Sequence, residues 1–159
     1  MLKGQSGPGV ISIGGCDYHD GTQTAGDTKD REIGIEIGRA VEYAHKIQVP
    51  LMIQVITDGG IYPREGSRTW QGDSVDTCMS VVGYYRPDAA PKYIRQQVGA
   101  YTNTQGADQS TIVGANPLFA AYGVFANYLQ AAGRLGEFQK IIPGVFSDQQ
   151  LQSLLIFEG

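Results

Sequence analysis

The stretch VISIGGCDYHDG, residues 10–21, decides which fold the sequence predicts. Its first four residues are apolar and mostly β-branched, which is typical of a short buried strand. Two glycines then turn the chain, and Asp17, His19 and Asp20 follow within four residues. We therefore expect a strand over 10–13 that ends in a polar loop, and this loop is either a ligand site or only a turn.

Downstream of this loop, the spacing of apolar residues predicts a helix that starts near Asp30 and ends before Pro50. Gly34 and Gly38 share one side of it, and we expect them to allow a close approach to a sheet. The segment LMIQVI (51–56) is nearly continuous in apolar residues, as in a strand of a parallel sheet. Strand, helix and strand in this order predict a right-handed βαβ unit. The expected buried stripe of the helix consists of Ile33, Ile37, Ala40, Val41, Ala44 and Ile47.

The middle of the chain combines a long polar loop with two further predicted strands. The loop covers 57–74 and is rich in glycine, and the strands are expected at 77–85 and 95–102. With the βαβ unit, they predict an α/β fold, a two-layer or three-layer sandwich around a mixed, mainly parallel sheet.

The C-terminal third of the sequence predicts helices. Asn116 followed by Pro117 is a typical helix start, and Gly133 is a typical helix end. Ser147 and Gln150 have the spacing of a capping box, which predicts a further short helix.

Length and composition predict one α/β domain over 10–159 after a flexible lead-in over 1–9, either complete or part of a larger domain. The net charge is −4 and there is no basic stripe, so we expect no nucleic-acid partner. No apolar run is long enough for a membrane span. The N-terminus has no apolar core of a signal peptide, so a cytoplasmic location is the default expectation. Cys16 and Cys78 are expected to be free thiols.

The two loops that follow the predicted strands 10–13 and 51–56 contain the best candidates for metal-binding residues. If strands 10–13 and 51–56 are parallel, their carboxyl ends meet at one edge, which brings Asp17 and His19 near Asp58. Asp73, in the sequence WQGD, follows in the long loop. Carboxylates with an imidazole suit Zn²⁺, Mn²⁺ or Mg²⁺, so these four residues are candidate metal ligands.

Simpler interpretations of the same residues remain open. Asp58 and Asp73 each lie beside a glycine and are also typical of turns. His45, the second histidine, falls late in the predicted helix, where a structural role is expected. No motif of a serine hydrolase, a phosphate-binding loop or a dinucleotide site is present, so no catalytic nucleophile can be named.

The order of these motifs carries a family resemblance. GG-x-D-x-H after a strand, then a helix, an apolar strand ending in TDG, and W-x-G-D together resemble the C-terminal half of alkaline-phosphatase/sulfatase-like proteins. The sequence is most similar to a bacterial and phage-associated branch of unknown function, often labelled general secretion pathway protein. The resemblance extends from about Val10 to the end of the chain, including the final LLIFEG.

This resemblance implies hydrolysis of phosphate or sulfate esters at a two-metal site. Asp17 and His19 match the D-x-H metal motif, and Asp58 and Asp73 stand where further ligands follow. Asp58 is followed by Gly59 where the family has a histidine or glutamate, and Asp73 replaces a histidine-bearing motif. The family's Ser or Thr nucleophile would precede Val10. The chain is then a fragment, or a second polypeptide supplies the other half, or the fold persists without the reaction.

Three functions follow from these observations. The first is a partial hydrolase that binds a divalent metal, and the second is a non-enzymatic structural or assembly protein. The third is a small-molecule binding module that uses the space between the two loops. Nine tyrosines and an aromatic C-terminal helix indicate a partner surface, for either a second copy or a missing N-terminal segment.

Overall fold

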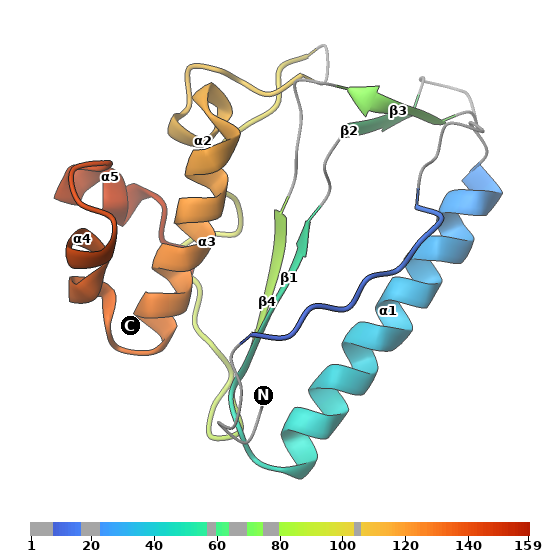
Figure 1. Cartoon of the computed structure of the whole chain (residues 1–159), viewed down its shortest axis with the longest axis horizontal. Helices are drawn as coiled ribbons and strands as arrows, with labels where there is room; N and C mark the ends of the chain where they lie inside the picture. The colour runs from blue at the N-terminus through green and yellow to red at the C-terminus, as the bar shows by residue number, and fades with distance from the viewer. Residues whose placement is uncertain (1–7, 17–22, 57–59, 64–69, 75–79, 104–105) are drawn as a thin grey trace. The chain divides into compact units, whose positions relative to one another are not determined.

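The computed structural model describes residues 8–16, 23–56, 60–63, 70–74, 80–103 and 106–159, with the backbone alone over 60–63 and 70–74 (Figure 1). These residues belong to two compact units, each of which is described by itself. The N-terminal unit comprises Met1–Ile53, Gly59–Val75 and Gly83–Ala90. The C-terminal unit comprises Gln54–Asp58, Asp76–Val82 and Pro91–Gly159.

Helix α1, Gln23–Lys46, is the longest element of the N-terminal unit. It begins well before Asp30, where the sequence predicted its start. Glu42 and Lys46, one turn apart on α1, form an ion pair with 2.7 Å between the carboxylate and ammonium groups. This contact lowers the pKa of Glu42, mainly through the hydrogen bond from Lys46.

The two glycines of α1 do not have the predicted role. Gly34 and Gly38 are exposed, and a Cβ atom built on either would meet nothing within 4 Å. Ala44 is instead the residue of the predicted stripe that becomes fully buried. The expected close approach of the glycine side to a sheet is therefore wrong for the described residues.

The described strands form two separate two-stranded sheets. β1, Leu51–Ile56, pairs with β4, Ser80–Tyr85, and Figure 1 shows that the two strands run in opposite directions. β2, Gly60–Pro63, pairs in antiparallel fashion with β3, Trp70–Ser74. The predicted strand at 51–56 is confirmed, the one at 77–85 is confirmed over Ser80–Tyr85, and the segment 57–74 contains a strand pair.

The predicted mainly parallel α/β sandwich is wrong. Residues 10–13 belong to no strand, and Val10 and Ile11 are 92% and 68% exposed. Without a strand at 10–13 there is no βαβ unit, and no parallel strand pair occurs in the described residues. Apolar content favours a strand but does not provide its partner, because pairing is decided by distant residues.

The predicted strand over 95–102 is also wrong. There the chain makes a single isolated bridge, in which Tyr101 faces Ala107. Gly99 has a φ of 82°, and a Cβ atom on it would lie 2.4 Å from Val113 Cγ2. This left-handed conformation interrupts an extended segment and brings the chain close to the next helix.

The C-terminal third is helical, as predicted. Its helices are α2 (Ile112–Ala115), α3 (Pro117–Ala131), the short 3₁₀ turn η2 (Leu135–Glu137), α4 (Phe138–Ile141) and α5 (Asp148–Ser153). Asn116 Oδ1 accepts a hydrogen bond from the Leu118 amide and starts α3, and Gly133 follows it with a φ of 67°. Ser147 and Gln150 form the predicted capping box of α5.

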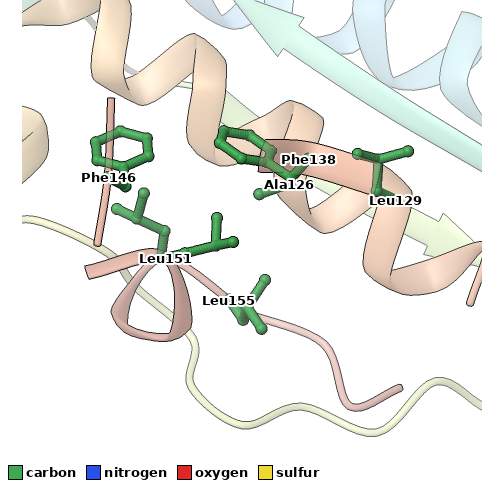
Figure 2. Close-up of a cluster of buried hydrophobic side chains, with 7 residues drawn as sticks. Ala126, Leu129, Phe138, Phe146, Leu151 and Leu155 are labelled. Atoms are coloured by element: carbon green, nitrogen blue, oxygen red, sulfur yellow. The ribbon is translucent and has the colours of Figure 1, made fainter. Parts of the chain in front are cut away.

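The hydrophobic core of the C-terminal unit lies between these helices. Figure 2 shows how Phe138 and Phe146 face Leu151 and the buried side of α3. The buried members of this core cluster are Ala126, Leu129, Phe138, Phe146, Leu151, Leu154 and Leu155.

A buried amide joins α3 to the C-terminal segment. Asn127 is 1% exposed, and its Nδ2 donates to the carbonyl oxygens of Gly123 and Leu154, both at 2.8 Å. Its Oδ1 accepts from the amides of Ile156 and Phe157 at 2.6 Å and 3.3 Å. All the polar groups of a buried side chain are thus satisfied, which fixes the course of the chain after α5.

Candidate metal centre

Three of the four predicted metal ligands, Asp17, His19 and Asp58, lie outside the described residues. The fourth, Asp73, lies in β3. The convergence of all four therefore stays a prediction, and the structure bears on it through the segments that flank them. These are the turn before Asp17 and the strand pair after Asp58.

The turn before Asp17 packs against helix α1. Gly15 has a φ of 76°, which favours glycine, and a Cβ atom on it would lie 3.1 Å from Cε of Lys29. The Cys16 thiol, which is free, donates to the carbonyl oxygen of Ile13 at 3.5 Å. Gly15 thus allows the alkyl chain of Lys29 to lie against the backbone that leads to Asp17.

Lys29 places an ammonium group beside this turn. Its Nζ atom lies 2.8 Å from Glu32 Oε2. The hydrogen bond to Glu32 raises the pKa of Lys29. The positive charge of Lys29 is paired with the Glu32 carboxylate. The sequence analysis missed Lys29 because it placed the helix start at Asp30, and no local motif marks the residue.

Asp73 lies at an irregularity of the β2–β3 pair. Gly60 pairs with Ser74 and Tyr62 with Gln71, so Ile61 alone faces the two residues Gly72 and Asp73. Such a bulge bends the strand and changes the direction of its side chains, and bulges are frequent next to active sites. The sequence indicates a turn at Gly72-Asp73 but not a bulge within a strand.

The same register places Asp73 close to the first residue of β2. Asp73 directly precedes Ser74, and Ser74 pairs with Gly60. Paired residues of antiparallel strands have Cα atoms about 4.5–5.5 Å apart. Asp58, two residues before Gly60 in the sequence, lies outside the described residues.

His45 is held in a separate place, at the end of α1. Its Nδ1 atom lies 2.9 Å from the hydroxyl of Tyr85, and the two rings meet edge to face with 6.1 Å between their centroids. This contact agrees with the structural role that the sequence suggested for His45.

The predicted donor set fits a divalent cation by its chemistry. Three carboxylates and one imidazole are suitable ligands for Zn²⁺ or Mn²⁺, and carboxylates alone also suit Mg²⁺. Within the described ranges, no group of three or more His, Cys, Asp or Glu side chains is arranged to hold a metal ion. The described residues therefore indicate no metal site besides the predicted one.

Comparisons with known proteins give no relative. No protein-family model matches the chain, and neither the curated proteins nor the solved structures contain a significant match. Among the residues that the structure describes, no helix has both the length and the apolar content needed to cross a membrane.

Proposed function

We propose that the chain is an alkaline-phosphatase-like domain that binds a divalent cation through Asp17, His19, Asp58 and Asp73. The observation that supports it best is the bulge of the β2–β3 pair, which holds Asp73 near the strand end that follows Asp58. Motif order supplies the family resemblance, and the donor set supplies the cation chemistry.

In this proposal each group has a defined task. The carboxylates and His19 hold the cation, which would polarise a phosphate or sulfate oxygen as a Lewis acid when bound. The family's nucleophile has no counterpart among the residues named here, so ester hydrolysis would need a Ser or Thr from another segment.

Metal content and metal-dependent stability test this proposal. The purified chain, stripped with a chelator, is titrated with Zn²⁺, Mn²⁺ and Mg²⁺ while heat release and melting temperature are recorded. We expect binding of at least one cation and a higher melting temperature. His19→Ala and Asp73→Asn should each weaken binding at least tenfold.

His45→Ala is the matched control, because it removes the other histidine, whose ring contacts Tyr85. It should leave metal affinity unchanged. The absence of binding by all three cations, or equal loss of affinity in His45→Ala and His19→Ala, would contradict the proposal.

A second candidate function, an assembly module, is favoured by the uneven burial of the two units. In the described part of the N-terminal unit, Ala44 is the only fully buried apolar side chain. Val10, Ile11, Ile35 and Tyr43 of the same unit are between 45% and 92% exposed. A contiguous patch of such side chains would mark a surface that a partner covers.

Light scattering coupled to size exclusion tests this second function. We expect a stable oligomer of the full chain at micromolar concentration. A monomer over the whole accessible concentration range would contradict it, whatever the result of the metal titrations.

A further inference from the structure

We propose that residues 10–13 pair as an added strand with an edge of the β1–β4 sheet in a second copy of the chain. This inference rests on the assembly function proposed above and names the contact that produces it. The three observations that support it concern the segment, the sheet edges and their chemical match.

The segment 10–13 is built to form a strand but does not form one. Val10, Ile11 and Ile13 are β-branched, and such residues favour extended, paired backbone. Val10 and Ile11 are nevertheless 92% and 68% exposed. Within the described residues, the amides of this segment donate no backbone hydrogen bond.

The β1–β4 sheet has only two strands among the described residues. Each strand therefore has one edge that the other does not cover. Isolated pairs of strands are marginally stable, and a third strand stabilises them. Ile56 of β1 and Val81 of β4 are 68% and 53% exposed, so apolar side chains are available next to these edges.

The composition of both strands is the third observation. Edge strands of natural proteins usually carry charged residues or prolines that block pairing with other chains. β1 reads LMIQVI and β4 reads SVVGYY, and neither contains a charge or a proline. The incoming segment is also uncharged from Pro8 to Cys16. No electrostatic repulsion therefore opposes addition of the segment to the sheet.

A second copy of the chain supplies a partner both for the segment 10–13 and for an edge of the β1–β4 sheet. Each chain supplies both a strand-forming segment and a two-stranded sheet. Reciprocal exchange places the segment of each copy on the sheet of the other, which closes a symmetric dimer. Added strands bind through main-chain hydrogen bonds, and the alternate side chains give specificity.

Sedimentation equilibrium of the full chain with matched variants tests this contact. Ile11→Lys and Val81→Lys should each weaken dimerisation at least tenfold, because each places a charge in the strand contact. Ile141→Lys is the control, since Ile141 is 54% exposed but lies in α4, outside the proposed contact. It should leave the dimer constant unchanged, and circular dichroism should show that all three variants keep their helix content.

Cross-linking between two different copies gives the decisive result. In a background of Cys16→Ser and Cys78→Ser, one tagged chain carries Ile11→Cys and an untagged chain carries Val81→Cys. Oxidation of the mixture should produce a disulfide-linked pair of tagged and untagged chains.

The outcomes separate the two proposals. A dimer that survives both lysine variants, with no mixed cross-link, overturns the strand exchange and leaves the assembly function standing. A disulfide that forms only when both cysteines are in one chain shows pairing within a copy and also overturns the exchange. A monomer at all concentrations overturns both the exchange and the assembly function.

Discussion

The two units of this protein differ in how their apolar residues are used. In the C-terminal unit, helices α3, α4 and α5 surround a closed core, and Phe138 and Phe157 are completely buried. In the described part of the N-terminal unit, α1 buries Ala44 fully and leaves Ile35 and Tyr43 about half exposed. Burial of apolar area is the main favourable contribution to folding, so we expect stability to reside in the C-terminal unit.

The difference does not come from the range of the contacts along the chain. Asn127 and Leu154, which join α3 to the C-terminal segment, are 27 residues apart, and Gln54 and Ser80 of the β1–β4 pair are 26 apart. The entropy of closing the two loops is therefore similar, and the units differ in how much apolar area their contacts bury. The predictions below test this contrast, beginning with the largest effect.

The first prediction concerns two fragments, residues 1–90 and 91–159, each of which contains most of one unit. Residues 91–159 contain the whole core cluster, so we expect this fragment to unfold cooperatively in urea. Residues 1–90 should give no cooperative transition, because their described part buries little apolar area. Circular dichroism at 222 nm across a urea gradient measures both. A cooperative transition in 1–90 would show that the contrast between the units is wrong.

The second prediction compares one core side chain with one exposed side chain. Phe138→Ala should lower the free energy of unfolding by about 4 kcal/mol, because it removes a buried ring and leaves a cavity. The Phe138 ring centroid lies 6.0 Å from those of Phe125 and Phe146. Ile35→Ala, on the exposed side of α1, should change it by less than about 0.5 kcal/mol. Equal effects of the two substitutions would contradict the proposed difference in burial between the two units.

The third prediction addresses the buried amide of Asn127. Asn127→Ala should cost about 3 kcal/mol, because it removes the hydrogen bonds that a buried side chain makes to Leu154, Ile156 and Phe157. Asn116→Ala is the matched control, since Asn116 accepts one hydrogen bond at the start of α3. Loss of this cap should cost about 1 kcal/mol. Urea titrations of both variants give the comparison.

Local signals explain which parts of the fold could be predicted from the sequence. The start of α3 at Asn116, its end before Gly133 and the capping box at Ser147 each depend on residues within one helical turn. Strand partners depend on distant residues. The segments 10–13 and 95–102 have strand-like composition, yet neither forms a strand in the structure.

The candidate site shows the same limit. Asp73 could be selected from the sequence as a polar residue next to a glycine, but its place in a bulge follows from pairing with a strand ten or more residues away. Lys29 was missed because α1 begins at Gln23, and the residues before Asp30 read equally well as helix caps. Both features depend on where an element begins or pairs, which a single sequence defines poorly.

The fourth prediction makes the same substitution in both units. In Gly114→Ala, the added Cβ atom would lie 2.0 Å from the carbonyl oxygen of Asp108, so the backbone must shift. We expect a loss of about 2 kcal/mol in the urea transition. Gly34→Ala has open space around it and should stabilise α1 by about 0.5–1 kcal/mol.

The gain in Gly34→Ala should appear as slower amide hydrogen exchange in α1 and a stronger signal at 222 nm. If this variant instead loses helix signal, the glycine side of α1 is covered in the folded protein. The comparison between the units would then need revision.

The smallest expected effect is a pH dependence from Asp108 in the C-terminal unit. Its Oδ1 atom accepts hydrogen bonds from the hydroxyl and the amide of Ser110, at 2.6 Å and 2.9 Å, and these lower the pKa of Asp108. A carboxyl whose pKa is lower in the folded state stabilises the protein above the unfolded value of about 3.9. This contribution disappears as the pH falls through the folded pKa.

Asp108→Asn isolates this contribution, because the amide oxygen can still accept a hydrogen bond but carries no charge. The free energy of unfolding should be lower in the variant than in the natural chain at pH 7, and the gap should narrow as the pH falls below the unfolded value and through the folded pKa of the carboxyl. Urea titrations across a series of pH values from 7 downward measure the gap. The side chain is exposed, so solvent screening keeps the effect small. A gap that stays constant with pH would assign the role of Asp108 to the shape of the turn before α2 and not to its charge.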